Sequence, residues 1–362
     1  MLYLIRKIFK LSLIILGIFI ILIFLGKVRN NFQSETNNFN TLPENGKEAV
    51  TPGDYFFTLT HGGIDRKYAV HVPINYNKID SVPVLIVLHG GGGNMEESIK
   101  FFNLNPKADK EGFLAVYPEG YGKNLAGKYL GTWNAGKCCA PSMDENIDDV
   151  GFIDKVIEKI TKDFHIDKNR IYSVGFSNGA QMSYRLACEL SDKIAAVALG
   201  GSVGTFEGCA PKRPVPVYMF QGTADPCTPY EGGTKCGGCM GEFFNAIGIP
   251  TPINIYQCDS VDAFTDKVLA MNKCQENSSV TYSQGSTTCV TYDTCANGSE
   301  VTSCKILGGG HVWPGNKTYT IDICNTHPSG YVCSAWKKAV GPLIPDFNVT
   351  DQIWNFFKKY QL

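Results

Sequence analysis

Short apolar runs and amphipathic segments alternate along most of this chain. Uninterrupted apolar runs are typical of strands that are buried on both faces of a parallel sheet. These runs occupy residues 82–88, 113–117, 171–174, 194–199 and 215–220. Segments with helical periodicity occupy residues 147–164, 178–190, 261–271 and 349–360. The alternation predicts an α/β fold with a doubly wound, mostly parallel sheet, whose ligand site lies beyond the carboxyl ends of the strands.

Two regions depart from this alternation. Residues 55–59 and 67–72 alternate between apolar and polar side chains around a Gly-Gly pair, which predicts an antiparallel hairpin. Residues 227–304 carry eight cysteines and little periodicity. We therefore expect one domain over residues 53–362, with a disulfide-rich insertion around one helix at about 227–304.

The amino-terminal residues differ in composition from the rest of the chain. Residues 11–26 are almost purely aliphatic and have basic residues on both sides, so residues 1–28 are predicted to be a signal peptide or an uncleaved membrane anchor. Residues 29–52 are polar and rich in asparagine, which predicts a flexible linker.

Cysteine content and charge limit the compartment and the partners. Fourteen cysteines favour an oxidising compartment, so we expect an extracytoplasmic protein that is either secreted or membrane-anchored. The formal net charge is −1, with acidic and basic residues interspersed, which argues against a nucleic-acid partner. The Cys236-x-x-Cys239 spacing resembles half of a zinc site, but no second half completes it, so disulfides are the expected use.

A serine lies where a predicted strand meets a predicted helix, in Gly175-Phe-Ser177-Asn-Gly179. A sharp turn of this kind exposes the serine hydroxyl and needs small residues two positions away on either side. The helix that follows directs its free N–H groups towards the place where an oxyanion would form. Ser177 is therefore a candidate nucleophile, although an isolated match to such a short motif also occurs by chance.

Glycines follow the first buried strand, in His89-Gly90-Gly91-Gly92-Gly93. Backbone N–H groups of Gly91 or Gly92, together with that of Asn178, are candidates for an oxyanion hole. A phosphate-binding loop is the competing interpretation, but the Gly-Lys-Ser/Thr ending is missing. We expect His89 itself to have a structural role.

Asp225 and His311 complete a possible triad. Asp225 follows the predicted strand 215–220, and His311 follows a strand-like segment at residues 301–307. An aspartate in such a loop often only forms a turn. The chain order Ser177, Asp225, His311 is nevertheless the order of an α/β-hydrolase triad, and each of the three residues lies just beyond a strand.

Together the motifs resemble the polyhydroxybutyrate depolymerase and feruloyl esterase family of α/β-hydrolases, a group similar to carbohydrate esterase family one. The resemblance rests on His89-Gly-Gly-Gly-Gly, Gly131-Thr-Trp-Asn-Ala-Gly-Lys-Cys-Cys139, Asp148-Asp-Val-Gly-Phe152, Gly-Phe-Ser177-Asn-Gly, Gly-Thr-Ala-Asp225 and Gly-Gly-His311-Val-Trp-Pro-Gly. It implies a serine esterase without metal or cofactor, with Ser177 as nucleophile, His311 as general base and Asp225 as its orienting acid. The implied substrates are feruloylated or acetylated polysaccharides, or hydroxyalkanoate polyesters.

The two adjacent cysteines that end the second motif are expected to form separate bridges. Adjacent Cα atoms are about 3.8 Å apart across a trans peptide bond, closer than a disulfide usually allows. Cys138 and Cys139 should therefore reach different partners, and the resemblance implies Cys188 and Cys209. Cys324 and Cys333 mark a second insert, which departs from the family pattern, as does the length of the insertion at 227–304.

The sequence allows more than one role for two tryptophans and two aspartates, and a second function for the chain. Trp133 and Trp313 are candidates for lining the substrate pocket, and Trp133 is equally a candidate for the core. Asp148 and Asp149 are predicted to cap a helix. The alternative function is a catalytically silent binding or adhesion ectodomain with this fold, which reaction with a fluorophosphonate would distinguish from an esterase.

Overall fold

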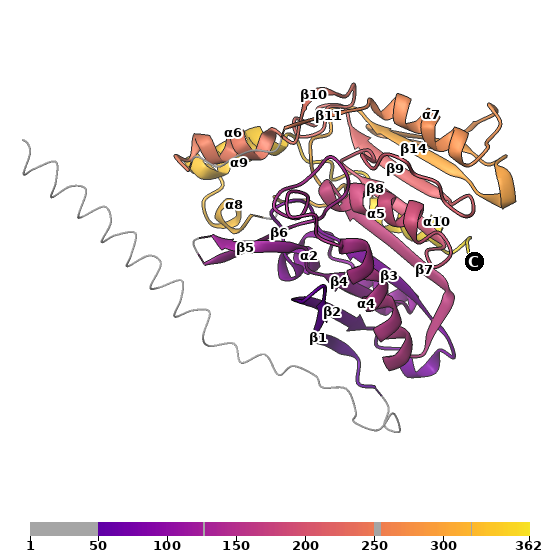
Figure 1. Cartoon of the computed structure of the whole chain (residues 1–362). Coiled ribbons are helices and arrows are strands. Elements are labelled where there is room, and N and C mark those ends of the chain that lie inside the picture. Colours follow the sequence, from indigo (N-terminus) through magenta and orange to yellow (C-terminus); the bar gives the residue numbers. More distant parts are fainter. Residues whose placement is uncertain (1–49, 126, 250–254, 320) are drawn as a thin grey trace, which may run out of the picture. The chain divides into compact units, whose positions relative to one another are not determined.

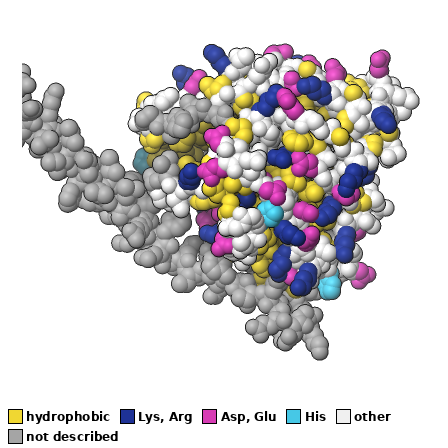
Figure 2. Space-filling model, viewed as in Figure 1, with side chains coloured by type: hydrophobic (Ala, Val, Ile, Leu, Met, Phe, Trp, Pro, Cys, Tyr) yellow, Lys and Arg dark blue, Asp and Glu magenta, His cyan; other side chains and the backbone are white. Residues whose placement is uncertain are grey.

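The computed structural model describes residues 50–125, 127–249, 255–319 and 321–362 (Figure 1). The predicted signal or anchor at residues 1–28 and nearly all of the predicted linker lie outside the described residues. Within the described residues, no helix is both long and apolar enough to cross a membrane. Basic and acidic side chains are interspersed over the face of the molecule shown in Figure 2.

A ten-stranded sheet runs through the described residues, in the order β1-β2-β4-β3-β7-β8-β9-β14-β13-β12. The strands are β1 (Gly53–His61), β2 (Ile64–Val72), β3 (Val82–Leu88), β4 (Leu114–Pro118), β7 (Ile166–Phe176), β8 (Ala196–Gly200), β9 (Val217–Gly222), β12 (Ser279–Gln284), β13 (Thr287–Tyr292) and β14 (Val301–Ile306). The six strands from β4 to β14 in this order are parallel, and antiparallel strands flank them at both edges. This is the α/β-hydrolase fold, as predicted.

Helices cover both faces of the sheet, because alternate side chains of the central strands point to opposite faces. Val84 and Ile86 of β3 share one core with helices α4, α5 and α7, whereas Leu85 and Val87 share the other with α2, α3 and α10. The helices on the first face are α4 (Asp149–Asp163), α5 (Asn178–Glu189) and α7 (Val261–Met271). Those on the second face are α2 (Met95–Phe102), α3 (Asn105–Glu111) and α10 (Val349–Phe357).

The insertion is more regular than its sequence suggested. It contains a second helix, α6 (Cys239–Ala246), and the small strands β10 (Gly233–Cys236) and β11 (Tyr256–Cys258), besides β12 and β13, which extend the main sheet. The expectation of one helix is therefore wrong. Strand β12 is exposed almost throughout, and Val280 and Tyr282 alternate in it with Ser, Thr and Gln over too few residues to predict a strand.

The two inserts pack against each other. Helix α6 lies beside α9 (Tyr331–Val340), and α8 (Asp322–Thr326) precedes α9 (Figure 1). Phe243 of α6 meets Trp336 of α9 edge to face, with ring centroids 5.2 Å apart. The hydroxyl of Tyr331 donates a hydrogen bond to the carbonyl oxygen of Ala246 at 2.7 Å. Below them in the same figure, β5 (Tyr121–Leu125) and β6 (Lys128–Thr132) form a hairpin.

All fourteen cysteines form disulfides, but two of the expected pairings are wrong. The pairs are 138–139, 188–209, 227–239, 236–258, 274–295, 289–304 and 324–333. Cys138 bonds to Cys139, and Cys188 bonds to Cys209. The expectation assumed a trans peptide bond between the adjacent cysteines, whereas this bond is cis and the Cα atoms are 3.1 Å apart. Cys188 is left 5.0 Å from Cys209, measured between Cα atoms, within the usual range for a disulfide.

Candidate active site

Ser177 occupies the sharp turn between β7 and α5. Its backbone has φ 57° and ψ −123°, a strained conformation for a residue with a side chain. A Cβ on Gly175 would overlap the carbonyl oxygen of Gly179, and one on Gly179 would overlap that of Leu88. Only glycine fits at these two positions, so the sequence around Ser177 permits a turn that a larger residue would prevent.

Asp225 and His311 lie together beyond the ends of β9 and β14. The Nδ1 atom of His311 is 2.7 Å from Oδ2 of Asp225. The Asp225 carboxylate also accepts hydrogen bonds from the backbone N–H groups of Cys227 and Thr228, both at 2.8 Å, and from the side chain of Gln221 at 2.9 Å. The buried carboxylate is thus fixed by three groups besides the histidine, and the Nε2 atom of His311 remains available for another partner.

The His311 ring lies next to the serine turn. It packs against Phe176, the residue before Ser177, with ring centroids 4.7 Å apart. A Cβ on Gly201 would lie 3.3 Å from Cε1 of His311, and the Ser177 N–H donates to Gly200 at 2.8 Å. The structure therefore brings all three predicted triad residues to the carboxyl edge of neighbouring parallel strands.

The glycine loop after β3 lies against the same turn. A Cβ on Gly90 would lie 3.3 Å from the Ser177 Cβ, and one on Gly91 would lie 3.7 Å from the Asn178 Cβ. The Gly92 N–H donates to the carbonyl oxygen of Gly131 at 2.8 Å and so is already engaged. Within the described part of the chain, the N–H groups of Gly91 and Asn178 have no hydrogen-bond acceptor. The geometry favours Gly91 over Gly92 as a candidate donor.

His89 has the structural role that was expected. Its Nε2 atom accepts a hydrogen bond from the Gly120 N–H at 2.9 Å, so Nδ1 carries the proton and donates to the Gly90 carbonyl oxygen at 2.8 Å. Burial lowers the pKa of His89 to about 4. The neutral ring fixes the first residue of the glycine loop.

Both candidate pocket tryptophans are buried. Trp133 is fully buried, and its indole N–H donates to the His89 carbonyl oxygen at 2.9 Å. Trp313 packs among Phe102, Phe176 and Phe220, and its indole N–H donates to Thr350. These contacts give both residues packing roles, and a contact with substrate stays a prediction.

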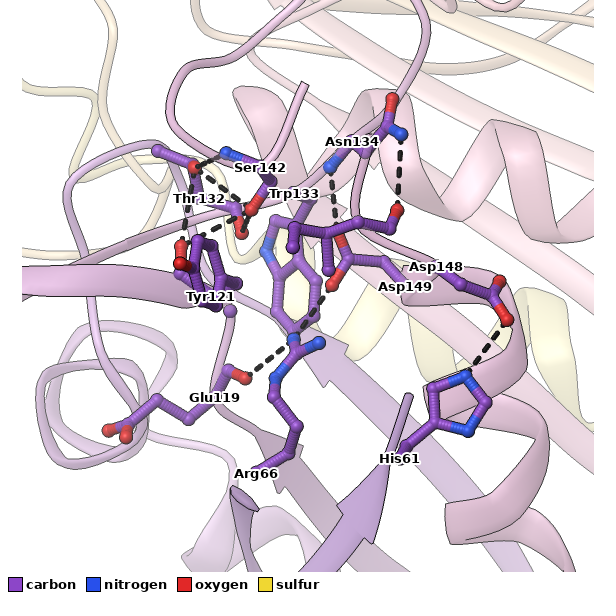
Figure 3. A network of polar contacts seen from close by, with 12 residues as sticks. His61, Arg66, Glu119, Tyr121, Thr132, Trp133, Asn134, Ser142, Asp148 and Asp149 are labelled. Carbon is purple, nitrogen blue, oxygen red and sulfur yellow. Dashed lines mark hydrogen bonds and ion pairs between the residues drawn. The ribbon is translucent and has the colours of Figure 1, made fainter. Parts of the chain in front are cut away.

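The two aspartates before α4 differ in their roles. Asp148 caps the helix, as predicted, by accepting the Gly151 N–H at 2.9 Å. Asp149 is not a cap: it is fully buried and its Oδ1 atom lies 2.7 Å from a guanidinium nitrogen of Arg66 (Figure 3). Burial raises the pKa of the Asp149 carboxyl, and Arg66 opposes this shift. The pairing joins residues 83 positions apart, and no local pattern in the sequence indicated it.

Sequence reasoning also missed a contribution from the insertion. Tyr256 of β11 places its hydroxyl against the side-chain amide of Gln181, one turn into α5. The same amide donates to the hydroxyl of Ser202 at 3.0 Å. Burial raises the pKa of Tyr256, with partial compensation from these hydrogen bonds. The insertion therefore reaches the helix that begins at the serine.

One group of potential metal ligands occurs among the described residues. It consists of Asp225, Cys227 and His311. The sulfur of Cys227 is bonded to that of Cys239, so it offers no thiolate to a metal.

The family profile and the related sequences agree on one enzyme class, the esterases. The family profile described as Esterase PHB depolymerase matches residues 66–227. NocK of Nocardia uniformis subsp. tsuyamanensis, which is named as an esterase, is 31% identical over 260 residues, covering 70% of this chain and 72% of that protein. Feruloyl esterase B of Piromyces equi is 28% identical over 251 residues, covering 68% of this chain but only 42% of that protein. Among solved structures, an acetyl xylan esterase from Aspergillus awamori aligns with a TM-score of 0.49 at 12% identity, over 71% of this chain and 94% of that one.

Proposed function

Because the chain belongs to the polyhydroxybutyrate depolymerase and feruloyl esterase family, we propose that it is a serine carboxylic-ester hydrolase that acts through an acyl-enzyme on Ser177. The observation that carries this proposal is the contact of His311 with the buried Asp225 carboxylate, beside the strained turn that holds Ser177. A buried acid, a histidine whose second ring nitrogen can accept a proton and a serine hydroxyl that is not fully buried are the groups that acyl transfer needs.

The proposed reaction has two half-reactions. Nε2 of His311 takes the hydroxyl proton as the Ser177 oxygen attacks the ester carbonyl carbon, and Asp225 holds the ring in the required tautomer. The N–H groups of Gly91 and Asn178 stabilise the negative oxygen of the tetrahedral intermediate. The histidine then gives its proton to the leaving alcohol, and water, activated by the same nitrogen, releases the acid and regenerates the serine.

Substitution of the triad tests this assignment. Ser177→Ala and His311→Ala should each lower kcat for a p-nitrophenyl ester by about 10⁴-fold or more, because triad members act as a unit. Asp225→Asn should cost less than the serine change, since the nucleophile and base remain. Asp262→Asn is a matched control, because Asp262 pairs with the hydroxyl of Tyr230 instead. Near-full activity of Ser177→Ala would refute the assignment.

The natural substrate and the location of the enzyme are further parts of the proposal. Relatives named feruloyl esterase and acetylxylan esterase support a screen over feruloyl, acetyl-xylan and short hydroxybutyrate esters. Seven disulfides support an extracytoplasmic location. We also propose a single catalytic domain over residues 53–362, preceded by an export segment at residues 1–28 and a linker at 29–52.

A further inference from the structure

Trp133 connects the two elements that carry the proposed oxyanion donors. Its indole N–H donates to the carbonyl oxygen of His89, just before the glycine loop. Its backbone N–H donates to Oδ1 of Asn178 at 2.7 Å, and the Asn178 side-chain amide donates back to the Trp133 carbonyl oxygen at 3.1 Å. A shift of Trp133 would therefore move the glycine loop and the start of α5 relative to each other.

A buried ion pair fixes the residue that follows Trp133. The Asn134 N–H donates to Oδ2 of Asp149 at 2.7 Å, and the other oxygen of this carboxylate faces Arg66 (Figure 3). The same guanidinium nitrogen of Arg66 donates to the Glu119 carbonyl oxygen at 3.0 Å. Arg66 is 3% exposed and Asp149 is 0% exposed. The network thus joins β2, the loop at Glu119 and the start of α4 to the segment after β6 that carries Trp133.

The buried pair of Arg66 and Asp149 is better explained by the position in which it holds its neighbours than by a gain in stability. Removing two charges from water costs several kcal/mol per ion, and an apolar pair of similar volume is often as stable. What an apolar pair cannot do is hold the Asn134 N–H at a fixed point, because it offers no hydrogen-bond acceptor. The position of the backbone matters for catalysis, because a small displacement of an oxyanion donor lowers the reaction rate.

We propose that Asp149 is a positioning residue of the oxyanion hole, which it orients through Asn134 and Trp133. This role rests on the proposed esterase function. Arg66 aligns the Asp149 carboxylate, the carboxylate holds the backbone at Asn134, and Trp133 sets the separation of the Gly91 and Asn178 N–H groups.

Asp149→Asn in the full-length protein tests the proposal. Arg66 and the Asn134 N–H donate to different oxygens of Asp149. An amide keeps an acceptor at only one of these two positions and turns an NH₂ group towards the other donor, so one of the two contacts is lost. We expect kcat for a p-nitrophenyl ester to fall by about 10- to 100-fold with KM nearly unchanged, less than the loss of a whole oxyanion donor. The inhibition constant of a trifluoromethyl ketone should rise by the same factor, because its hemiketal oxygen occupies the oxyanion position. Trp133→Phe removes the hydrogen bond to His89 and part of the buried ring while retaining an aromatic side chain, and it should change both quantities in the same direction.

Glu300→Gln serves as the matched control. Glu300 is also a buried carboxylate in an ion pair, with Lys359 at 2.9 Å and with the hydroxyl of Tyr360. We expect its loss to lower the melting temperature without changing kcat or the inhibition constant.

The outcomes separate positioning from stability. If Asp149→Asn and Trp133→Phe lower only the melting temperature, as Glu300→Gln does, the positioning role is overturned. If Asp149→Asn does not fold, unchanged kinetics of Trp133→Phe would overturn it equally. Wild-type protein that neither hydrolyses esters nor binds the ketone would instead overturn the proposed function itself.

Discussion

The histidines of this chain illustrate how the surroundings of a residue decide its chemistry. His89 and His311 both follow strands and both precede or follow glycines in the sequence. His89 has backbone partners on both ring nitrogens, whereas His311 has Asp225 on one nitrogen and, among residues 50–125, 127–249, 255–319 and 321–362, no hydrogen-bond partner on the other. His89 therefore has a structural role, whereas His311 can still take up a proton on Nε2.

Burial of His89 predicts a pH dependence of stability. Its pKa of about 4 in the folded protein lies below the ordinary value of 6.5, so the unfolded chain binds the proton more readily. The neutral ring contributes about 3 kcal/mol to the free energy of unfolding above pH 6.5. This contribution is lost as the pH falls from 6.5 towards 4.

Comparison of His89→Gln with wild type by urea unfolding measures this effect. The loss of unfolding free energy on substitution should be larger at pH 7 than at pH 4.5. His165→Gln, at an exposed histidine, controls for the change of residue type. An equal loss at both pH values would show that His89 is not held neutral by the fold.

At the scale of elements, the strand, turn and helix around Ser177 are fixed by glycines. A Cβ on Gly179 would overlap the carbonyl oxygens of Leu88 and His89, so the start of α5 packs directly on the end of β3. Gly179→Ala should therefore destabilise the protein by about 1–3 kcal/mol or more through overpacking, and should lower activity as well.

Gly62→Ala provides the comparison for this prediction. Gly62 has φ 58° in the β1–β2 turn, but a Cβ there would meet nothing within 4 Å. Its substitution should cost about 1–2 kcal/mol from backbone strain alone and leave the kinetics unchanged. Chemical denaturation and steady-state kinetics of both variants check the pair. The close-packing account fails if Gly179→Ala is the milder of the two.

The sequence predicted some elements well for a physical reason. Strands buried on both faces, such as β3 and β9, must be continuously apolar, and their runs are visible without any alignment. Strand β12 offers only the short alternation of Val280 and Tyr282, and the pairing of Arg66 with Asp149 depends on tertiary packing. The triad could be proposed because its residues follow strands, whereas Gln181, Tyr256 and Asp149 carry no local signal.

At the scale of the whole molecule, disulfides hold the insertion at 227–304 to the hydrolase core, whereas the bridge of the second insert, between Cys324 and Cys333, lies within that insert. Cys227, beside the Asp225 loop, is joined to α6, and Cys289 of β13 is joined to Cys304 of β14. Fourteen cysteines permit very many pairings, and spacing alone does not select among them.

Mass mapping of peptides prepared without reduction tests this connectivity. We expect Cys188 linked to Cys209, and an uncleaved peptide with Cys138 and Cys139 that is lighter by two hydrogen atoms than its reduced form. The Cys188–Cys209 bond closes a loop with a sequence separation of 21, which the chain-entropy model values at about 3 kcal/mol. Reduction should therefore lower the melting temperature. A cross-link from Cys138 or Cys139 to Cys188 would contradict the observed pairing.

The measurement that tests the central claim most directly is the site of covalent modification. After reaction of the wild-type protein with a fluorophosphonate, intact mass and peptide mapping should show one adduct, on Ser177. The same reaction should leave Ser177→Ala unmodified, with Asp262→Asn labelled like wild type. An adduct on another residue, or ester hydrolysis by Ser177→Ala without any adduct, would contradict an acyl-enzyme mechanism on Ser177.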